Sequence, residues 1–148
     1  EAKLDQTGTY RAIDEMQRFL DYFPNSERAK QAQDIIFELQ DKLVYKELLN
    51  AQLYYNLGNY MGNNYQSAII TAQNALKEYP YTRYKETLSM LILKSKYQEA
   101  VQSIEEKKPE RFRDVIDEYY SFINDYPSGE YSKEAENIFK VANKYVKD

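Results

Sequence analysis

The sequence predicts an all-α fold in which αα-hairpins are stacked in a row. First, a segment ending in aromatic-Pro occurs three times, at 12–24, 68–80 and 115–127. Second, its apolar residues are spaced by one or three positions, which places them on one face of a helix. Third, a second helical pattern follows each proline. Repeated units of this kind bury their apolar faces by packing on neighbouring units.

The first helix of each unit is defined by apolar residues at fixed distances before the proline. These are Ile13, Ile69 and Ile116 eleven positions before it, Leu20, Leu76 and Ile123 four before it, and Phe23, Tyr79 and Tyr126 immediately before it. Each proline ends its helix because the residue before proline is disfavoured in the helical region.

The second helix of each unit repeats as well. Eight positions after the prolines stand Ala32, Leu88 and Ala135, and the positions eleven and twelve after them are also apolar. Asn25 or Ser26, Thr82 and Ser128 follow the prolines and are suitable N-caps for these helices. Each unit is therefore a helix, a tight turn and a second helix.

In chain order, the expected helices lie near 9–23, 26–42, 44–58, 64–79, 82–105, 109–126 and 129–146. The prolines are 56 and 47 residues apart, more than the 34 residues of an ordinary tetratricopeptide repeat. The helical pattern from about 27 to 57 is long for one helix, so we expect a break near 41–45, with one continuous helix as the alternative. A Gly- and Asn-rich loop is expected at 58–64. Pro109 is expected in the first turn of its helix.

These observations predict a single domain, 1–148, with repeat units at roughly 9–58, 64–105 and 109–146. Its architecture is expected to be a tetratricopeptide-like superhelix, or solenoid.

Composition excludes most catalytic chemistry. The chain has no His, Cys or Trp, so the usual zinc, haem and iron–sulfur ligand sets and His- or Cys-dependent nucleophilic catalysis are absent. The densest carboxylates, Glu105-Glu106 and Glu134/Glu136, fit solvated helix faces. No catalytic, cofactor or metal residue is predicted. A net charge of −4 gives no sign of nucleic-acid binding.

The 16 tyrosines are the other unusual feature of the composition. Most are expected to fill helix–helix seams, where the ring packs and the hydroxyl reaches water. Others surround the central loop and the second proline turn, where a helical array exposes its edge. The residues predicted to contact a protein partner are Tyr54, Tyr55, Tyr60, Tyr81, Arg83 and Tyr84.

Several motifs, in this order, resemble the C-terminal half of the BamD family of outer-membrane assembly lipoproteins. They are the segments 5–14, 22–26, 51–55, 65–69 and 78–82, which include Tyr22-Phe23-Pro24-Asn25-Ser26 and Glu78-Tyr79-Pro80-Tyr81-Thr82. The likeness extends to about Lys96. Compared with the family, the chain is expected to have an expanded 58–64 loop and an extended third repeat, and to lack the N-terminal repeats and the lipid-bearing Cys.

The resemblance implies a non-enzymatic scaffold on the periplasmic face of the outer membrane of a Gram-negative bacterium, tethered through a lipidated Cys upstream. Its implied partners are the POTRA domains of a BamA-like protein, and further subunits of the assembly machine or unfolded barrel substrates. Two other hypotheses remain open: a general tetratricopeptide adaptor in another envelope or cytoplasmic complex, and an accessory domain of an enzyme whose catalytic part lies elsewhere.

Overall fold

The computed structural model describes residues 1–146, and within them the regular structure is entirely helical. The helices are α1 (Thr7–Tyr22), α2 (Ala29–Leu57), α3 (Asn64–Glu78), α4 (Lys85–Val101), the short 3-10 helix η1 (Glu105–Lys107), α5 (Lys108–Asp125) and α6 (Ser132–Val146). The prediction of an all-α protein is confirmed. Pro109 lies in the first turn of α5, as expected.

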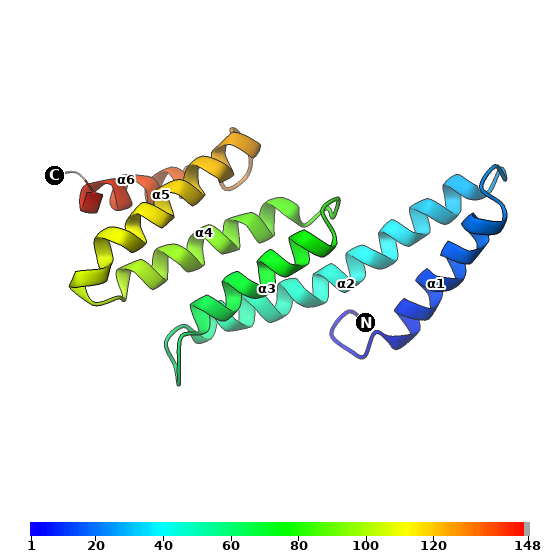
Figure 1. Cartoon of the computed structure of the whole chain (residues 1–148), viewed down its shortest axis with the longest axis horizontal. Helices are drawn as coiled ribbons and strands as arrows, with labels where there is room; N and C mark the ends of the chain where they lie inside the picture. Colours follow the sequence, from blue (N-terminus) through cyan, green and yellow to red (C-terminus); the bar gives the residue numbers. More distant parts are fainter. Residues whose placement is uncertain (147–148) are drawn as a thin grey trace.

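Each α-helix packs mainly on the helices before and after it in the sequence. Figure 1 shows the resulting row, which runs from the α1–α2 hairpin at the right to the α5–α6 hairpin at the left. The long helix α2 packs on α1 with its first half and on α3 with its second half. The expected succession of αα-hairpins is therefore present.

The three aromatic-Pro turns have nearly the same backbone conformation. Phe23, Tyr79 and Tyr126 end α1, α3 and α5 with φ between −127° and −132° and ψ between 59° and 69°. In each turn, the first residue of the next helix donates its N–H to the carbonyl two positions after the proline, on Ser26, Thr82 or Gly129. The sequence repeat is thus also a structural repeat.

The predicted starts of the second helices are wrong by three residues, because an extra turn follows each proline. The helices begin at Ala29, Lys85 and Ser132 rather than at 26, 82 and 129. The hydroxyls of Ser26 and Thr82 accept hydrogen bonds from the N–H groups of Arg28 and Tyr84, at 3.2 and 3.3 Å. These side chains stabilise the turn and do not occupy the N-cap position.

The expected break near 41–45 is wrong, since α2 is one continuous helix of 29 residues. No Gly or Pro interrupts the sequence from 29 to 57. Leu43 and Val44, at the expected break, are buried with 4% and 0% exposure. The helix ends only where Gly58 adopts a positive φ of 57°.

Two apolar clusters hold the row of helices together. The first joins α2, α3 and α4 around residues such as Val44, Ala72 and Leu88, and the second joins α4, α5 and α6 around Phe112 and Val115. Helix α4 contributes to both, because it has buried side chains on opposite faces. Buried residues on opposite faces place α4 between the two clusters.

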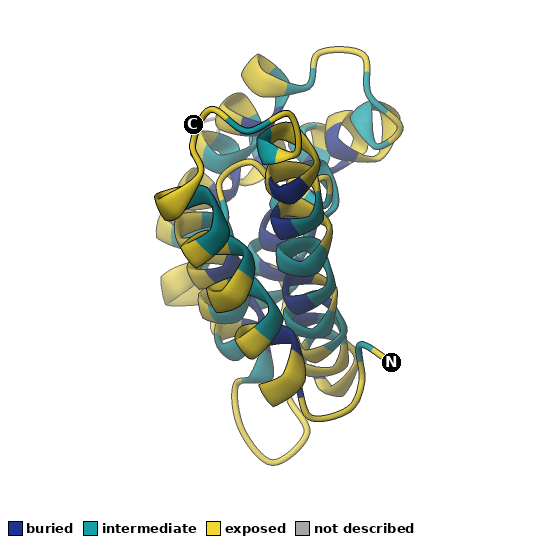
Figure 2. Cartoon of the chain, turned by 90° about the vertical axis from the view of Figure 1, so that its right-hand side faces the viewer, coloured by how far each residue is buried: buried dark blue, intermediate teal, exposed yellow. Residues whose placement is uncertain are grey.

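Helix α1 is much less buried than its repeat partners. Its residue Ala12 is half-buried, whereas Ala68 and Val115, at the same repeat position, are fully buried. Phe23, which ends α1, is 57% exposed. Figure 2 shows buried residues turned toward neighbouring helices and exposed residues on the outer faces. Because α1 packs mainly on α2, its repeat positions cannot reach the same burial.

Candidate functional site

The six predicted contact residues lie at the two opposite ends of α3. Tyr54, Tyr55 and Tyr60 stand at the α2–α3 end, whereas Tyr81, Arg83 and Tyr84 stand in the α3–α4 turn. Helix α3 has 15 residues, so its ends are roughly 22 Å apart at 1.5 Å per residue. The six residues therefore form two separate groups, and their role in binding stays a prediction.

In the α3–α4 group, Arg83 and Tyr84 are part of a network that fixes the turn to α2. Asp41 on α2 accepts hydrogen bonds from the Thr82 hydroxyl (2.6 Å) and the Arg83 N–H (3.3 Å). The Arg83 guanidinium donates to the Tyr84 hydroxyl at 2.9 Å and lies over its ring. The Tyr84 hydroxyl, with a smaller contribution from Asp41, raises the pKa of Arg83. Tyr81 stands outside this network and is 85% exposed.

In the α2–α3 group, Tyr55 packs inside the molecule and Tyr54 and Tyr60 face solvent. The Tyr55 ring contacts Tyr65 edge-on at 5.8 Å, and the Lys94 ammonium lies 4.9 Å from its centroid. Burial raises the pKa of the Tyr55 phenol. Tyr54 and Tyr60 are 36% and 69% exposed. A partner could therefore reach Tyr54 and Tyr60 without disturbing the core.

The α2–α3 end also carries a signal that the sequence analysis missed. Residues 48–76 contain no Asp, Glu, Lys or Arg, although charged residues make up 30% of the chain, which corresponds to about nine in a stretch of this length. Counting charged residues along the sequence would have found this segment. It covers the last third of α2, the loop and nearly all of α3.

The exposed part of this segment is apolar and amide-rich, and we call it the neutral hairpin surface. Its members include Leu53, Tyr54, Asn56, Leu57, Asn59, Tyr60, Met61, Asn63 and Ile70. The C-terminal end of α4 adjoins it, because Asn59 donates a hydrogen bond to the Gln102 side chain. Val101 and Ile104, also exposed, lie within two residues of Gln102 in the sequence.

The α2–α3 loop is held in a defined shape that exposes Tyr60 and Met61. The Asn64 N–H donates to the Gly58 carbonyl at 2.9 Å, and the Asn64 amide donates to the Tyr60 carbonyl at 2.7 Å. Asn63 caps α3 by accepting the Gln66 N–H. Met61 is 89% exposed and has a φ of 55°, a strained value for a residue with a side chain. Such strain is found more often at functional sites than elsewhere.

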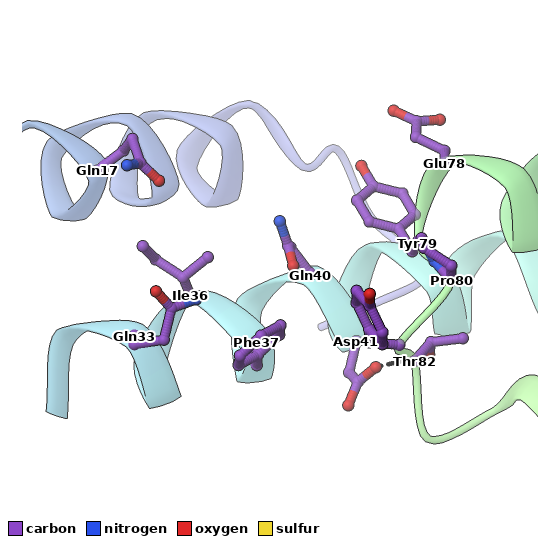
Figure 3. Close-up of a pocket in the computed structure, with 11 residues that line it drawn as sticks. Gln17, Gln33, Ile36, Phe37, Gln40, Asp41, Glu78, Tyr79, Pro80 and Thr82 are labelled. Carbon is purple, nitrogen blue, oxygen red and sulfur yellow. Dashed lines mark hydrogen bonds between the residues drawn. The ribbon is translucent and has the colours of Figure 1, made fainter. Parts of the chain in front are cut away.

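A groove lies at the other side of the molecule, between α1 and the end of α3. Gln33, Ile36, Phe37, Gln40 and Asp41 of α2 form its floor, and the other lining residues are Gln17, Glu78, Tyr79, Pro80, Tyr81 and Thr82. Figure 3 shows Gln17 on α1 across from Glu78 and Tyr79, with Gln40 on the helix between them. The groove has a volume of about 300 Å³.

Within residues 1–146, no cluster of acidic side chains is suited to hold a metal ion. The same residues include no helix that is both long and apolar enough to cross a bilayer. The described residues therefore form a row of helical hairpins, which makes the class of protein an all-helical one built from αα-hairpins.

Comparison with known families gives a match over more than half of the chain. A family model described as an outer membrane lipoprotein, YfiO, matches residues 1–92. The chain belongs to this BamD-like family of outer membrane lipoproteins. The match includes α1 to α3 and the first half of α4, and therefore the neutral hairpin surface and the groove. No individual curated protein matches the chain.

Proposed function

We propose that this protein is a non-enzymatic scaffold of the outer-membrane β-barrel assembly machinery, at the periplasmic face of the outer membrane. In this proposal its hairpins form a tetratricopeptide-like superhelix that binds the POTRA domains of a BamA-like partner. Membership of the BamD-like family supports the assembly role, and the succession of αα-hairpins supports the architecture.

We assign the POTRA contact to the neutral hairpin surface. The centres of protein–protein interfaces are depleted in Lys, Glu and Asp and enriched in aromatic residues and Met. The absence of charge from 48–76, together with the exposed Tyr54, Tyr60 and Met61, matches this composition. This single observation carries the assignment. A charged partner group would lose its hydration here without gaining an ion pair, so the surface favours a neutral partner patch.

Calorimetric titration with the cognate POTRA domains tests the assignment. The double variant Tyr60→Ser/Met61→Ser is expected to weaken binding at least tenfold, which is about 1.4 kcal/mol. Both side chains point into solvent, so the variant should keep its helical circular dichroism spectrum.

Tyr81→Ser provides the matched control, because Tyr81 is equally exposed but lies at the opposite end of α3. It should bind like the parent protein. If Tyr81→Ser weakens binding and the double variant does not, the contact belongs to the α3–α4 turn. A folded parent protein that binds no POTRA domain would overturn the proposed partner and favour a general adaptor.

A further inference from the structure

The chain contains few side chains that a peroxide oxidises directly. Cys, Trp and His are absent, and the three methionines are Met16, Met61 and Met90. A peroxide transfers one oxygen atom to a thioether sulfur, which becomes a sulfoxide. Two-electron oxidation of this protein therefore concentrates on the three methionine sulfurs.

The three methionines differ strongly in their exposure to solvent. Met90 on α4 is 1% exposed within the second apolar cluster. Met16 on α1 is half-buried and lines a small apolar cavity beside Phe19. Met61 is 89% exposed, more than any other large apolar residue among 1–146. Because oxidation follows the exposure of the sulfur, Met61 is the methionine that an oxidant reaches first.

The exposure of Met61 is a property of the folded loop. The α2–α3 loop projects beyond the two helices that it joins (Figure 1). Asn64 binds the carbonyls on both sides of Met61, since its side-chain amide donates to Tyr60 at 2.7 Å and its N–H donates to Gly62 at 3.2 Å. These bonds hold the backbone at Met61, where φ is 55°, so the side chain reaches solvent without unfolding of the loop.

Oxidation at this position changes the chemistry of the neutral hairpin surface. A thioether is apolar, whereas a sulfoxide is a polar group that accepts hydrogen bonds. The segment 48–76 contains no Lys or Arg. A partner that covers the Met61 sulfoxide with an apolar patch would remove its hydration, and the segment supplies no charged donor in its place. Burying a polar group in this way costs free energy.

We propose that Met61 is a modification site at which oxidation by a peroxide weakens the partner contact of the neutral hairpin surface. One oxygen atom is added to the Met61 sulfur, and hydrogen peroxide leaves as water. In the reverse step two thiols are oxidised to a disulfide, and the sulfoxide oxygen leaves as water. Because the chain has no Cys, those thiols belong to a separate sulfoxide reductase. The effect on binding rests on the proposed function, whereas the order in which the methionines are oxidised does not.

Peptide mass spectrometry after treatment with increasing concentrations of hydrogen peroxide tests the modification site. We expect Met61 to be oxidised first, Met16 more slowly and Met90 last, with no change in the helical circular dichroism spectrum while only Met61 is modified. In urea-unfolded protein, the control, the three should react at the same rate. Oxidation of Met16 or Met90 ahead of Met61 in the folded protein would overturn the site.

Calorimetric titration with the cognate POTRA domains measures the effect on binding, after the peroxide has been removed. The protein oxidised at Met61 is expected to bind about tenfold more weakly. Treatment with two sulfoxide reductases, one for each epimer at sulfur, should restore the affinity. The variant Met16→Leu should show the same peroxide effect as the parent protein. The variant Met61→Leu should have the same affinity before and after peroxide.

The results separate this inference from the proposed function. Unchanged affinity of the protein oxidised at Met61, or an equal peroxide effect in Met61→Leu, would overturn the inference and leave the proposed function intact. If the untreated protein binds no POTRA domain, the proposed function fails and the effect of oxidation on binding is overturned with it. The order of methionine oxidation is then decided by mass spectrometry alone.

Discussion

At the scale of single residues, the α2–α3 loop depends on a glycine that no other residue can replace without strain. Gly58 has φ 57° and ψ −118°, a combination that side chains disfavour. A Cβ at this position would lie 2.7 Å from the Tyr65 hydroxyl. That hydroxyl accepts a hydrogen bond from Gln102 at 3.0 Å. The loop, α3 and the end of α4 therefore all depend on the backbone at Gly58.

Gly58→Ala is expected to lower the free energy of unfolding by about 1–3 kcal/mol, through backbone strain and displacement of Tyr65. Urea denaturation followed by circular dichroism measures the change. Gly8→Ala is the control, because Gly8 lies in α1 and a Cβ there would meet no atom within 4 Å. That variant should gain about 0.5–1 kcal/mol from reduced freedom of the unfolded chain. Equal stability of Gly58→Ala and the parent protein would contradict the loop conformation described here.

At the scale of helices, burial follows the number of neighbours more closely than the repeat position. Leu88 on α4 is completely buried in the first apolar cluster, whereas Leu76 on α3 packs against the same cluster and is partly exposed. Leu76 stands four positions before Pro80 and Leu88 eight positions after it, and both positions are apolar in all three repeats. Helix α3 packs mainly on α2 and α4, whereas α4 packs on α3 and α5 and also contacts α2 and α6.

Leu88→Ala is therefore expected to cost about 2–5 kcal/mol, because it leaves a cavity in a closed core. Leu76→Ala should cost less, about 1–2 kcal/mol, because part of that side chain already contacts water. Thermal and urea unfolding of the two variants give the comparison. An equal loss would show that solvent exposure at position 76 has no energetic consequence.

At the scale of the whole molecule, stability is expected to be uneven along the row of helices. Helix α4 is shared by both apolar clusters, whereas the only buried residue of α1 is Thr9. Proteins open locally where few apolar contacts hold an element. The α1 end should therefore open more often than the centre.

Native-state amide hydrogen exchange should show α1 amides exchanging at least tenfold faster than those of α4, after correction for intrinsic rates. The amides of α4 should exchange only through global unfolding. Equal protection in α1 and α4 would instead mean that the described chain unfolds as one cooperative unit. The same data test the single-domain prediction, since separate domains would open independently on the two sides of α4.

The sequence by itself determined the helical class and the three aromatic-Pro turns. It also determined that the residues eight positions after each proline face the core. Ala32, Leu88 and Ala135 are all buried, because local periodicity and proline stereochemistry act within one turn of the chain. The family resemblance, read from motifs in the first 96 residues, is confirmed by the match over 1–92. The three-residue delay of the second helices was missed, because the turn is set by backbone hydrogen bonds that no single residue type specifies.

Only the tertiary structure decided the length of α2, the burial of α1 and the division of the six predicted contact residues into two groups. The continuity of α2 depends on Leu43 and Val44 packing against other helices, and length statistics carry no information about such contacts. Tyr54 and Tyr55 are adjacent in the sequence, yet one faces solvent and the other packs on Tyr65. Surfaces are formed by residues from several helices, so the groove between α1 and the end of α3 exists only once the helices are assembled.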